Sequence, residues 1–402
     1  MPAVPEIPQD IIDTIIDELA TDPSTLSACA LAARSFRSPS QKHMYETIKM
    51  DLSPGHPSHT SVHRLLDILT TNPLLGTSVK SLIVVLPHSN TEKLSGISRL
   101  FPRLRKIVIT CSLVHEGGTS RWNAVAEELR VDLYRLMRSP SVEEISFHSI
   151  QGFPTRHLTT CGQLKAITLI DVEPDDSVES LVPPMPADTY TCPSPSVGQL
   201  RALHIQPWKR LSPFINHLTN PSSSLSLTRL REYRIELYKS SECFETFQTT
   251  SELIAGSLEK LTLEVYSLAY NATPVPFDLL SLKRLKALKV AIGWTTTPSL
   301  VWLQTFLETS IPPVHDLGTI TFEFDWVSSE DDFWRHVDRV LVEAPSLAKV
   351  HLGLSFVSYG PKDLQWEGTF DLGVMRTLMP RLVARGSFTV HMNDVKLFTV
   401  PR

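Results

Sequence analysis

Three histidines close to residue 60 are the side chains whose types and spacing come nearest to metal chemistry. His59 and His63 are four residues apart, so a helix would place both imidazoles on one face, as in a metal-binding pair, and His56 precedes them. No thiolate stands beside them to complete a structural zinc site. We therefore expect a polar loop that enters a helix, with no bound metal and no cofactor.

The sequence lacks the motifs of covalent and phosphoryl chemistry. It has no Gly-rich phosphate loop, no nucleophile elbow and no H-E-x-x-H pair. The acidic residues Asp325, Glu330, Asp331 and Asp332 lack the spacing of a calcium loop and are typical of a solvated helix start. We expect no catalytic residue and no enzymatic activity. An enzyme whose site is assembled from distant residues is kept as the third alternative.

A set of aromatic and acidic residues is the better candidate for binding. Trp208, Tyr238 and Tyr266 stand at the ninth position of three consecutive sequence repeats, and Glu236 and Glu264 stand two residues earlier in the second and third. Alternation along a strand turns these positions away from the core, and exposed aromatic residues anchor protein interfaces. We predict that these five residues bind a protein substrate. The alternative is that the strands end earlier and the rings pack against loops.

The repeat that positions these residues has three apolar positions, the first, the fourth and the sixth. Ten copies are clear: Val79/Leu82/Val84, Leu104/Ile107/Ile109, Val142/Ile145/Phe147, Leu164/Ile167/Leu169, Leu200/Leu203/Ile205, Leu230/Tyr233/Ile235, Leu258/Leu261/Leu263, Leu285/Leu288/Val290, Leu317/Ile320/Phe322 and Leu347/Val350/Leu352. A degraded eleventh copy begins at Leu382 and includes Phe388 and Val390. The mean step of about 30 residues is typical of a solenoid.

Helical spacing between the copies completes the predicted repeat unit. It is seen in residues 124–129, 244–253 and 302–307. A strand and a helix per copy predict an α/β fold over residues 79–402, an irregular leucine-rich-repeat solenoid of stacked parallel strands with outer helices. A Pro-rich loop interrupts this array near residues 173–195. The alternative is an ordinary α/β sheet of unrelated units.

The first 52 residues are expected to form a separate module of three short helices. Apolar residues at helical spacing predict one helix with a single apolar face, and a second helix runs from Leu26 to Phe36. Met44, Tyr45 and Ile48 form a third short apolar stretch, and residues 53–78 form a connecting helix and array cap. So small a module makes a poor core alone. It needs either a partner protein or the end of the array to cover it.

The order of residues in this module resembles an F-box of the divergent type found in mushroom-forming fungi. The elements of the resemblance are Ile7-Pro8, Ile11-Ile12, Asp22-Pro23, Thr25-Leu26, Cys29-Ala30-Leu31, Arg34-Ser35-Phe36 and Tyr45 with Ile48. Phe36 stands where many members have Trp. The resemblance implies that the module binds the Skp1 adaptor of cullin-RING ubiquitin ligases. It also implies that Ile7, Pro8, Ile11, Leu26, Leu31, Phe36 and Tyr45 face the adaptor or form the core of the F-box, and we take them as the candidate adaptor-binding residues.

The composition excludes several other classes of protein. The 402 residues are 42% hydrophobic and 20% charged, which is enough to bury a core, and the net charge of -5 argues against a general nucleic-acid binder. We see neither an apolar run long enough for a membrane span nor a signal peptide. Five scattered cysteines suit a reducing compartment, so we expect the cytoplasm or the nucleus.

These observations lead to one expected function and one alternative. We expect the substrate-recognition subunit of an SCF-type (Skp1-cullin-F-box) ubiquitin ligase, which binds Skp1 with its cullin complex and an unknown protein substrate, but neither nucleic acid nor membrane. The alternative is a non-enzymatic repeat scaffold whose N-terminal helices only cap the array.

Overall fold

The computed structural model describes most of the chain and divides it into two units. The described residues are 7–53, 58–86, 96–111, 120–174, 198–206, 212–220, 223–237, 241–265, 279, 281–292, 297–310, 317–325, 331–347, 350–357, 372–392 and 395–400. Unit 1 is Met1–Gly198 and unit 2 is Gln199–Arg402.

Unit 1 begins with three short helices, α1 (Gln9–Glu18), α2 (Pro23–Ala32) and α3 (Arg34–Met44). The carboxylate of Asp22 accepts hydrogen bonds from the N–H groups of Ser24 (3.0 Å) and Thr25 (3.2 Å) and so caps α2, while Pro23 occupies its first turn. The single helix predicted from Leu26 to Phe36 is wrong. Ala33 has an extended backbone (φ -150°, ψ 152°), which ends α2 and starts α3.

The segment after α3 is the first strand of the sheet and not part of the helical module. β1 (Thr47–Asp51) pairs in parallel with β2 (Ser81–Leu86), with Ile48 opposite Leu82 and Met50 opposite Val84. Tyr45, Ile48 and Met50 have the same spacing as the repeat motif, so this is an earlier copy that begins at Tyr45. The helices of the predicted module therefore end at Met44, eight residues before its predicted boundary.

The rest of unit 1 continues the same parallel sheet and adds helices and a second sheet. The main strands are β1, β2, β3 (Lys106–Cys111), β5 (Glu144–His148) and β7 (Ala166–Ile170), paired in parallel in this order. A three-stranded sheet contains β4 (Ser120–Arg121), β6 (Ile150–Phe153) and β8 (Glu173–Pro174). The helices are α4 (Ser58–Thr71), α5 (Pro73–Ser78), α6 (Ile97–Leu100), η1 (Trp122–Ala124), α7 (Glu127–Met137) and η2 (Thr155–Thr160).

Unit 2 is built on a parallel sheet that ends in an antiparallel pair. Its strands are β10 (Ala202–Gln206), β12 (Glu232–Leu237), β13 (Lys260–Val265), β14 (Ala287–Ile292), β15 (Thr319–Asp325), β16 (His351–Val357), β17 (Phe388–Met392) and β18 (Val395–Val400). They pair in this order, and only the last pair is antiparallel. The short strands β9 (Gly198–Gln199) and β11 (Leu225–Ser226) form a two-stranded sheet.

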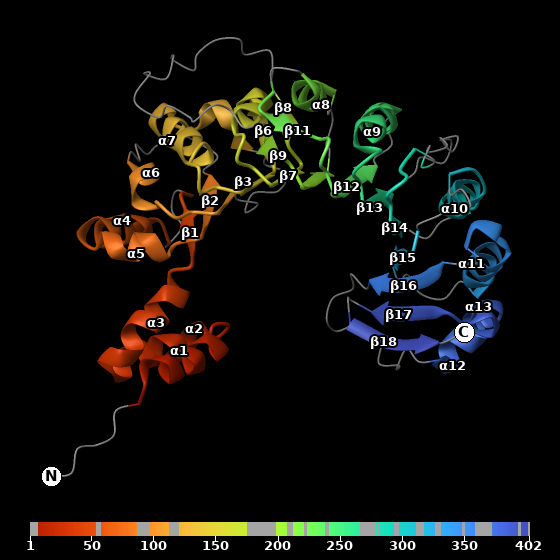
Figure 1. Ribbon diagram of the computed structural model, residues 1–402, viewed down its shortest axis with the longest axis horizontal. Helices are drawn as coiled ribbons and strands as arrows, with labels where there is room; N and C mark the ends of the chain where they lie inside the picture. Colours follow the sequence, from red (N-terminus) through yellow and green to blue (C-terminus); the bar gives the residue numbers. More distant parts are fainter. Residues whose placement is uncertain are drawn as a thin grey trace. The chain divides into compact units, whose positions relative to one another are not determined.

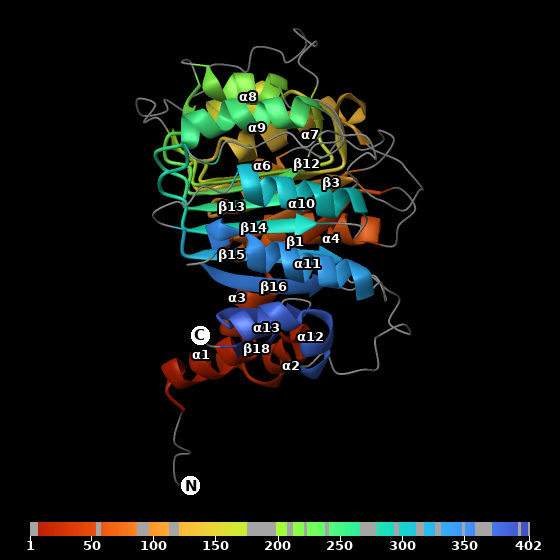
Figure 2. The same ribbon diagram turned by 90° about the vertical axis from the view of Figure 1, so that its right-hand side faces the viewer.

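Helices cover one face of the unit 2 strands, as Figures 1 and 2 show for α8–α11. They are α8 (Ser212–Thr219), α9 (Ser241–Ile254), α10 (Thr297–Thr309), α11 (Asp331–Glu343), η3 (Pro345–Leu347), α12 (Leu372–Leu378) and α13 (Pro380–Arg385). Helices α9 and α10 contain the segments predicted as helical, and α11 starts at the predicted acidic turn. The α/β class with parallel strands is confirmed.

One backbone hydrogen-bond pattern recurs from strand to strand. The carbonyl of the second motif residue accepts two successive N–H groups of the next copy. Arg105 accepts from Glu143 (2.8 Å) and Glu144 (3.0 Å), and Arg231 accepts from Glu259 (2.9 Å) and Lys260 (2.8 Å). The carbonyl of Glu46 does the same, since it accepts the N–H groups of Lys80 and Ser81 (both 2.9 Å). The start of each of these strands is therefore joined to its neighbour in the same way.

The motif residues form the core, but the predicted register of one copy is wrong. The first, fourth and sixth positions of the first eight predicted copies are all buried. In the tenth copy, however, Leu352 and not Val350 lies opposite Ile320, and Leu354 lies opposite Phe322. The strand therefore starts two residues later than predicted, because apolar residues at 350, 352 and 354 fit two registers equally well.

Candidate functional site

The helical module α1–α3 has a small core of its own. Ile12, Ile16 and Leu26 are buried together, and the partly buried Leu19, Cys29 and Phe36 pack against them. Leu26, one of the residues predicted to face the adaptor or to form the core of the module, is only 1% exposed and belongs to this core. The core explains how three short helices hold together without covering their remaining apolar residues.

Helix α1 has two apolar stripes and not the single face expected. Ile12 and Ile16 point into the module core, whereas Ile7, Ile11 and Ile15 are roughly half exposed. The two sets differ by one residue of offset, which turns a helical side chain by about 100°. The repeated Ile-Ile pairs at 11–12 and 15–16 indicate two apolar stripes in the sequence, because a surface helix with one buried face needs only one residue of each pair.

Two other helices of the module, α2 and α3, also carry exposed apolar side chains. Leu31 at the end of α2 is 82% exposed, and Met44 at the end of α3 is also exposed. Of the predicted adaptor-binding residues, Ile7, Pro8, Ile11 and Leu31 are exposed, while Phe36 and Tyr45 are partly buried. We call Ile7, Ile11, Ile15, Leu31 and Met44 the exposed apolar set. Ile15 and Met44 were not predicted.

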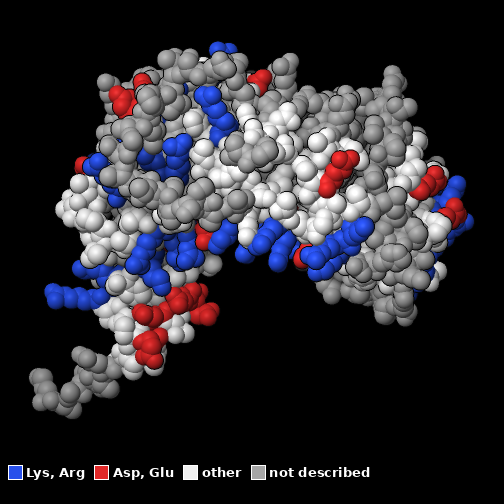
Figure 3. Space-filling view, turned by 45° about the horizontal axis from the view of Figure 1, so that its top comes forward, with Lys and Arg blue, Asp and Glu red and all other residues white. Residues whose placement is uncertain are grey.

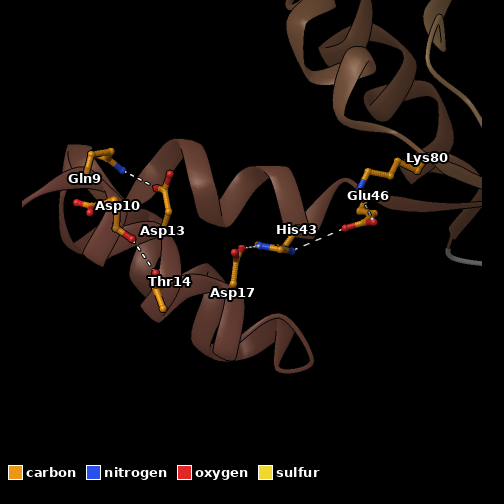
Figure 4. A network of polar contacts seen from close by, with 8 residues as sticks. All are labelled: Gln9, Asp10, Asp13, Thr14, Asp17, His43, Glu46 and Lys80. Atoms are coloured by element: carbon orange, nitrogen blue, oxygen red, sulfur yellow. Dashed lines mark hydrogen bonds and ion pairs between the residues drawn. The ribbon is translucent and has the colours of Figure 1, made fainter.

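A chain of polar contacts links α1, α3 and the start of the sheet (Figure 4). Nε2 of His43 lies 2.6 Å from Oδ1 of Asp17, and Nδ1 of His43 lies 3.7 Å from Oε2 of Glu46. Oε1 of Glu46 in turn lies 2.8 Å from Nζ of Lys80, the residue just before β2. At the other end of α1, Gln9 donates to Asp13 (2.8 Å). The contact of Asp17 with His43 ties α1 to α3, and the contact of Glu46 with Lys80 ties the end of the module to the sheet.

The predicted substrate-binding residues are only partly within the described chain. Trp208, Tyr238 and Tyr266 lie outside the described residues. Glu236 and Glu264 lie opposite each other on β12 and β13, but they are 2% and 4% exposed. Their predicted exposure is therefore wrong, although strand alternation does separate them from the core residues Ile235 and Leu263.

Ion pairs between neighbouring strands occupy this face of the unit 2 sheet. Arg234 on β12 pairs with Glu264 on β13, and Lys289 on β14 pairs with Glu323 on β15 at 2.8 Å. In each pair the base belongs to the fifth motif position and the acid to the seventh position of the next copy. These diagonal pairs engage Glu264 and Glu323 with bases of the neighbouring strands, so neither of these two glutamates is free to anchor a ligand.

A buried polar cluster in unit 1 was not foreseen. Trp122 donates from Nε1 to the hydroxyl of Tyr134 (2.7 Å), and the ring of His157 lies 4.3 Å from that of Tyr134. Burial raises the pKa of Tyr134 to about 12. Burial, together with the nearby Arg138 and Arg156, lowers the pKa of His157 to about 4. The three rings come from η1, α7 and η2, whose approach depends on the tertiary fold.

The described residues contain neither a grouped set of metal ligands nor a membrane-spanning helix. Within the described ranges, no three His, Cys, Asp or Glu side chains are grouped as metal ligands would be. No helix in the part of the chain that the structure describes is long and apolar enough to cross a bilayer. No protein-family model matches the chain, and no curated protein matches it.

Proposed function

We propose that the chain is the substrate-recognition subunit of an SCF-type ubiquitin ligase, with an F-box at its N-terminus and a leucine-rich-repeat-like solenoid after it. The observation that carries the proposal is the exposed apolar set on the helical module. These side chains stay in water although the module has packed its own core. Burying a large aliphatic side chain contributes about 1.5–3 kcal/mol, so a partner that covers the set gains substantial stabilisation.

The geometry of the module favours docking over the alternative of a cap. An end cap would direct its apolar residues towards the first strand of the sheet. Instead, the buried residues of α1 and α2 pack on each other and on α3, and Ile11 and Leu31 are exposed. The module meets the rest of unit 1 where α3 packs against α5 and through backbone and polar contacts at Glu46 and Lys80.

The remainder of the chain suits the recognition half of such a subunit. The recurring strand starts, with one carbonyl accepting two N–H groups, support a solenoid made of copies of one unit. In this proposal the array holds a protein substrate, catalysis belongs to the other subunits, and the complex works in the cytoplasm or the nucleus.

The test is co-purification of the full chain with purified Skp1. The full chain is needed because a fragment that ends at residue 52 would carry β1 without its partner strand β2. Stable co-elution supports the proposal. If no complex forms at protein concentrations well above the dissociation constants of ordinary protein complexes, the proposal is contradicted and the plain scaffold is favoured.

A further inference from the structure

Basic residues gather at the amino-terminal ends of the first strands of unit 2. They are Arg201, Arg229, Arg231, Lys260, Lys283, Arg284 and Lys286, all exposed. Figure 3 shows Lys and Arg side chains collected on this part of the surface. We call these seven residues the basic strip. Such a concentration is unusual in a chain whose net charge is -5.

Two acidic residues stand at the same strand starts, and each is engaged by a lysine. Glu232 pairs with Lys260 (2.7 Å), and Glu259 pairs with Lys286 (3.5 Å). The hydrogen bond to Glu232 raises the pKa of Lys260, which keeps this lysine charged. The strip and these two acidic neighbours therefore carry seven positive and two negative charges together.

The remaining five basic residues lack an acidic partner among the described residues. Arg229 donates to the amide oxygen of Gln199 (2.6 Å), which is neutral. Arg201 and Arg231 are neighbours across β10 and β12, since the N–H of Arg231 donates to the carbonyl of Arg201 (2.8 Å). Two like charges so close together repel each other in the free protein. An anionic partner removes that repulsion and gains two guanidinium contacts.

At the matching edge of unit 1 three lysines are paired with acids, while Arg105 has no acidic partner among the described residues. Lys80 pairs with Glu46 (2.8 Å), Lys106 with Glu144 (3.5 Å) and Lys165 with Glu143 (2.6 Å). The repeat can therefore place an acid beside a base at these positions. In unit 2, two arginines follow each other at the second motif position, and the acid that comes next, Glu259, pairs with Lys286.

We infer that the basic strip binds a carboxylate-rich, extended segment of a partner protein. The strands are about 4.8 Å apart, so the strip extends about 14 Å from β10 to β14, the length of about four extended residues. Single charges spread along that length fit successive Asp or Glu side chains. A phosphate instead needs several donors that converge on one point. Where the chain acts as a substrate receptor, the segment belongs to the substrate, and to that extent the inference rests on the proposed function.

The test is fluorescence anisotropy of the full chain with a labelled peptide of alternating Glu and Ser, without Skp1. Because no adaptor is present, the result does not depend on the proposed function. We expect saturable binding that weakens as salt rises. In the double variant Arg201→Glu/Arg231→Glu, binding should fall by about tenfold or more. The milder Arg201→Gln/Arg231→Gln should bind at an intermediate level, and circular dichroism checks the fold of both.

A matched control makes the same charge change elsewhere in unit 2. Arg339 on α11 and Arg376 on α12 are exposed, and Arg339→Glu/Arg376→Glu should bind the peptide within about twofold of wild type. Equal losses in both double variants, or no binding by wild type, would overturn the inference. So would stronger binding of a phosphoserine peptide or an oligonucleotide through the same arginines. Self-association of the chain that blocks the peptide would also overturn it.

Discussion

Nε2 of His43 in α3 lies 2.6 Å from Oδ1 of Asp17 in α1, and this contact ties the first helix of the module to the third. We predict that Asp17→Asn loosens α1 with little effect on the sheet. Asp17 is mostly exposed, so the loss should be about 1 kcal/mol or less. Hydrogen exchange should become faster in α1 and stay unchanged in β12 and β13. Equal protection of α1 in both proteins would contradict the role of this contact.

The two leucines of α2 should respond oppositely to truncation. Leu26 is buried in the module core, and Leu26→Ala should destabilise the module by about 2–4 kcal/mol. Leu31 is 82% exposed, and Leu31→Ala should change its stability by less than about 0.5 kcal/mol. Limited proteolysis within residues 9–44 compares the two. Similar sensitivity of both variants would mean that the core is wrongly assigned.

Gly76 in helix α5 has no room for a side chain. A Cβ built on Gly76 would lie 2.1 Å from the carbonyl oxygen of Leu100, so the backbone must move in Gly76→Ala. We expect a loss of about 1–3 kcal/mol in thermal or denaturant unfolding. The control is Gly256→Ala, where nothing lies within 4 Å of the new Cβ and the change should be below about 0.5 kcal/mol. Equal stability of the two variants would contradict the close approach.

His157 should make unit 1 sensitive to acid. Its folded pKa of about 4 lies below the ordinary value of 6.5, mainly because it is buried. Between these two pH values the unfolded chain binds a proton that the folded chain does not. Stability from this group is therefore fully present above pH 6.5 and is lost as the pH falls towards 4.

Denaturant unfolding at several pH values tests this acid sensitivity. Wild type should lose about 1–2 kcal/mol more than His157→Phe over that window, after allowance for the partial exposure of the ring. Phe keeps a planar ring against Tyr134 and removes the titrating group. Parallel pH curves for the two proteins would show that another residue controls the acid response.

The repeated core of the sheet was readable from the sequence because each strand repeats the same spacing. Positions four and six of a copy point into the core, and parallel pairing then aligns them, as with Leu261 and Leu288. The same regularity hid the first copy. Tyr45 and Ile48 fit both a repeat and the end of the helical module, and only the pairing of Ile48 with Leu82 decides between them.

Contacts between distant segments could not be read from the sequence. The buried carboxylate of Asp338 in α11 accepts the N–H groups of Arg381 (3.1 Å) and Leu382 (2.7 Å) at the start of α13. This satisfies helix N–H groups that would otherwise lack partners. In the sequence Asp338 is one more acid on a helix. The burial of Glu236 and Glu264 could not be predicted for a similar reason. Alternation along a strand predicts on which face of the sheet a side chain lies, but not whether other side chains cover that face.

The measurement that tests the docking module most directly is calorimetric titration of Skp1 into three full-length proteins. They are wild type, Leu31→Asp in the exposed apolar set, and Leu74→Asp on α5, where Leu74 is 77% exposed. We predict that Leu31→Asp weakens binding by about tenfold or more. Leu74→Asp should stay within about twofold of wild type, since it makes the same change outside the set. No binding by wild type, or equal affinities of the two variants, would contradict the account.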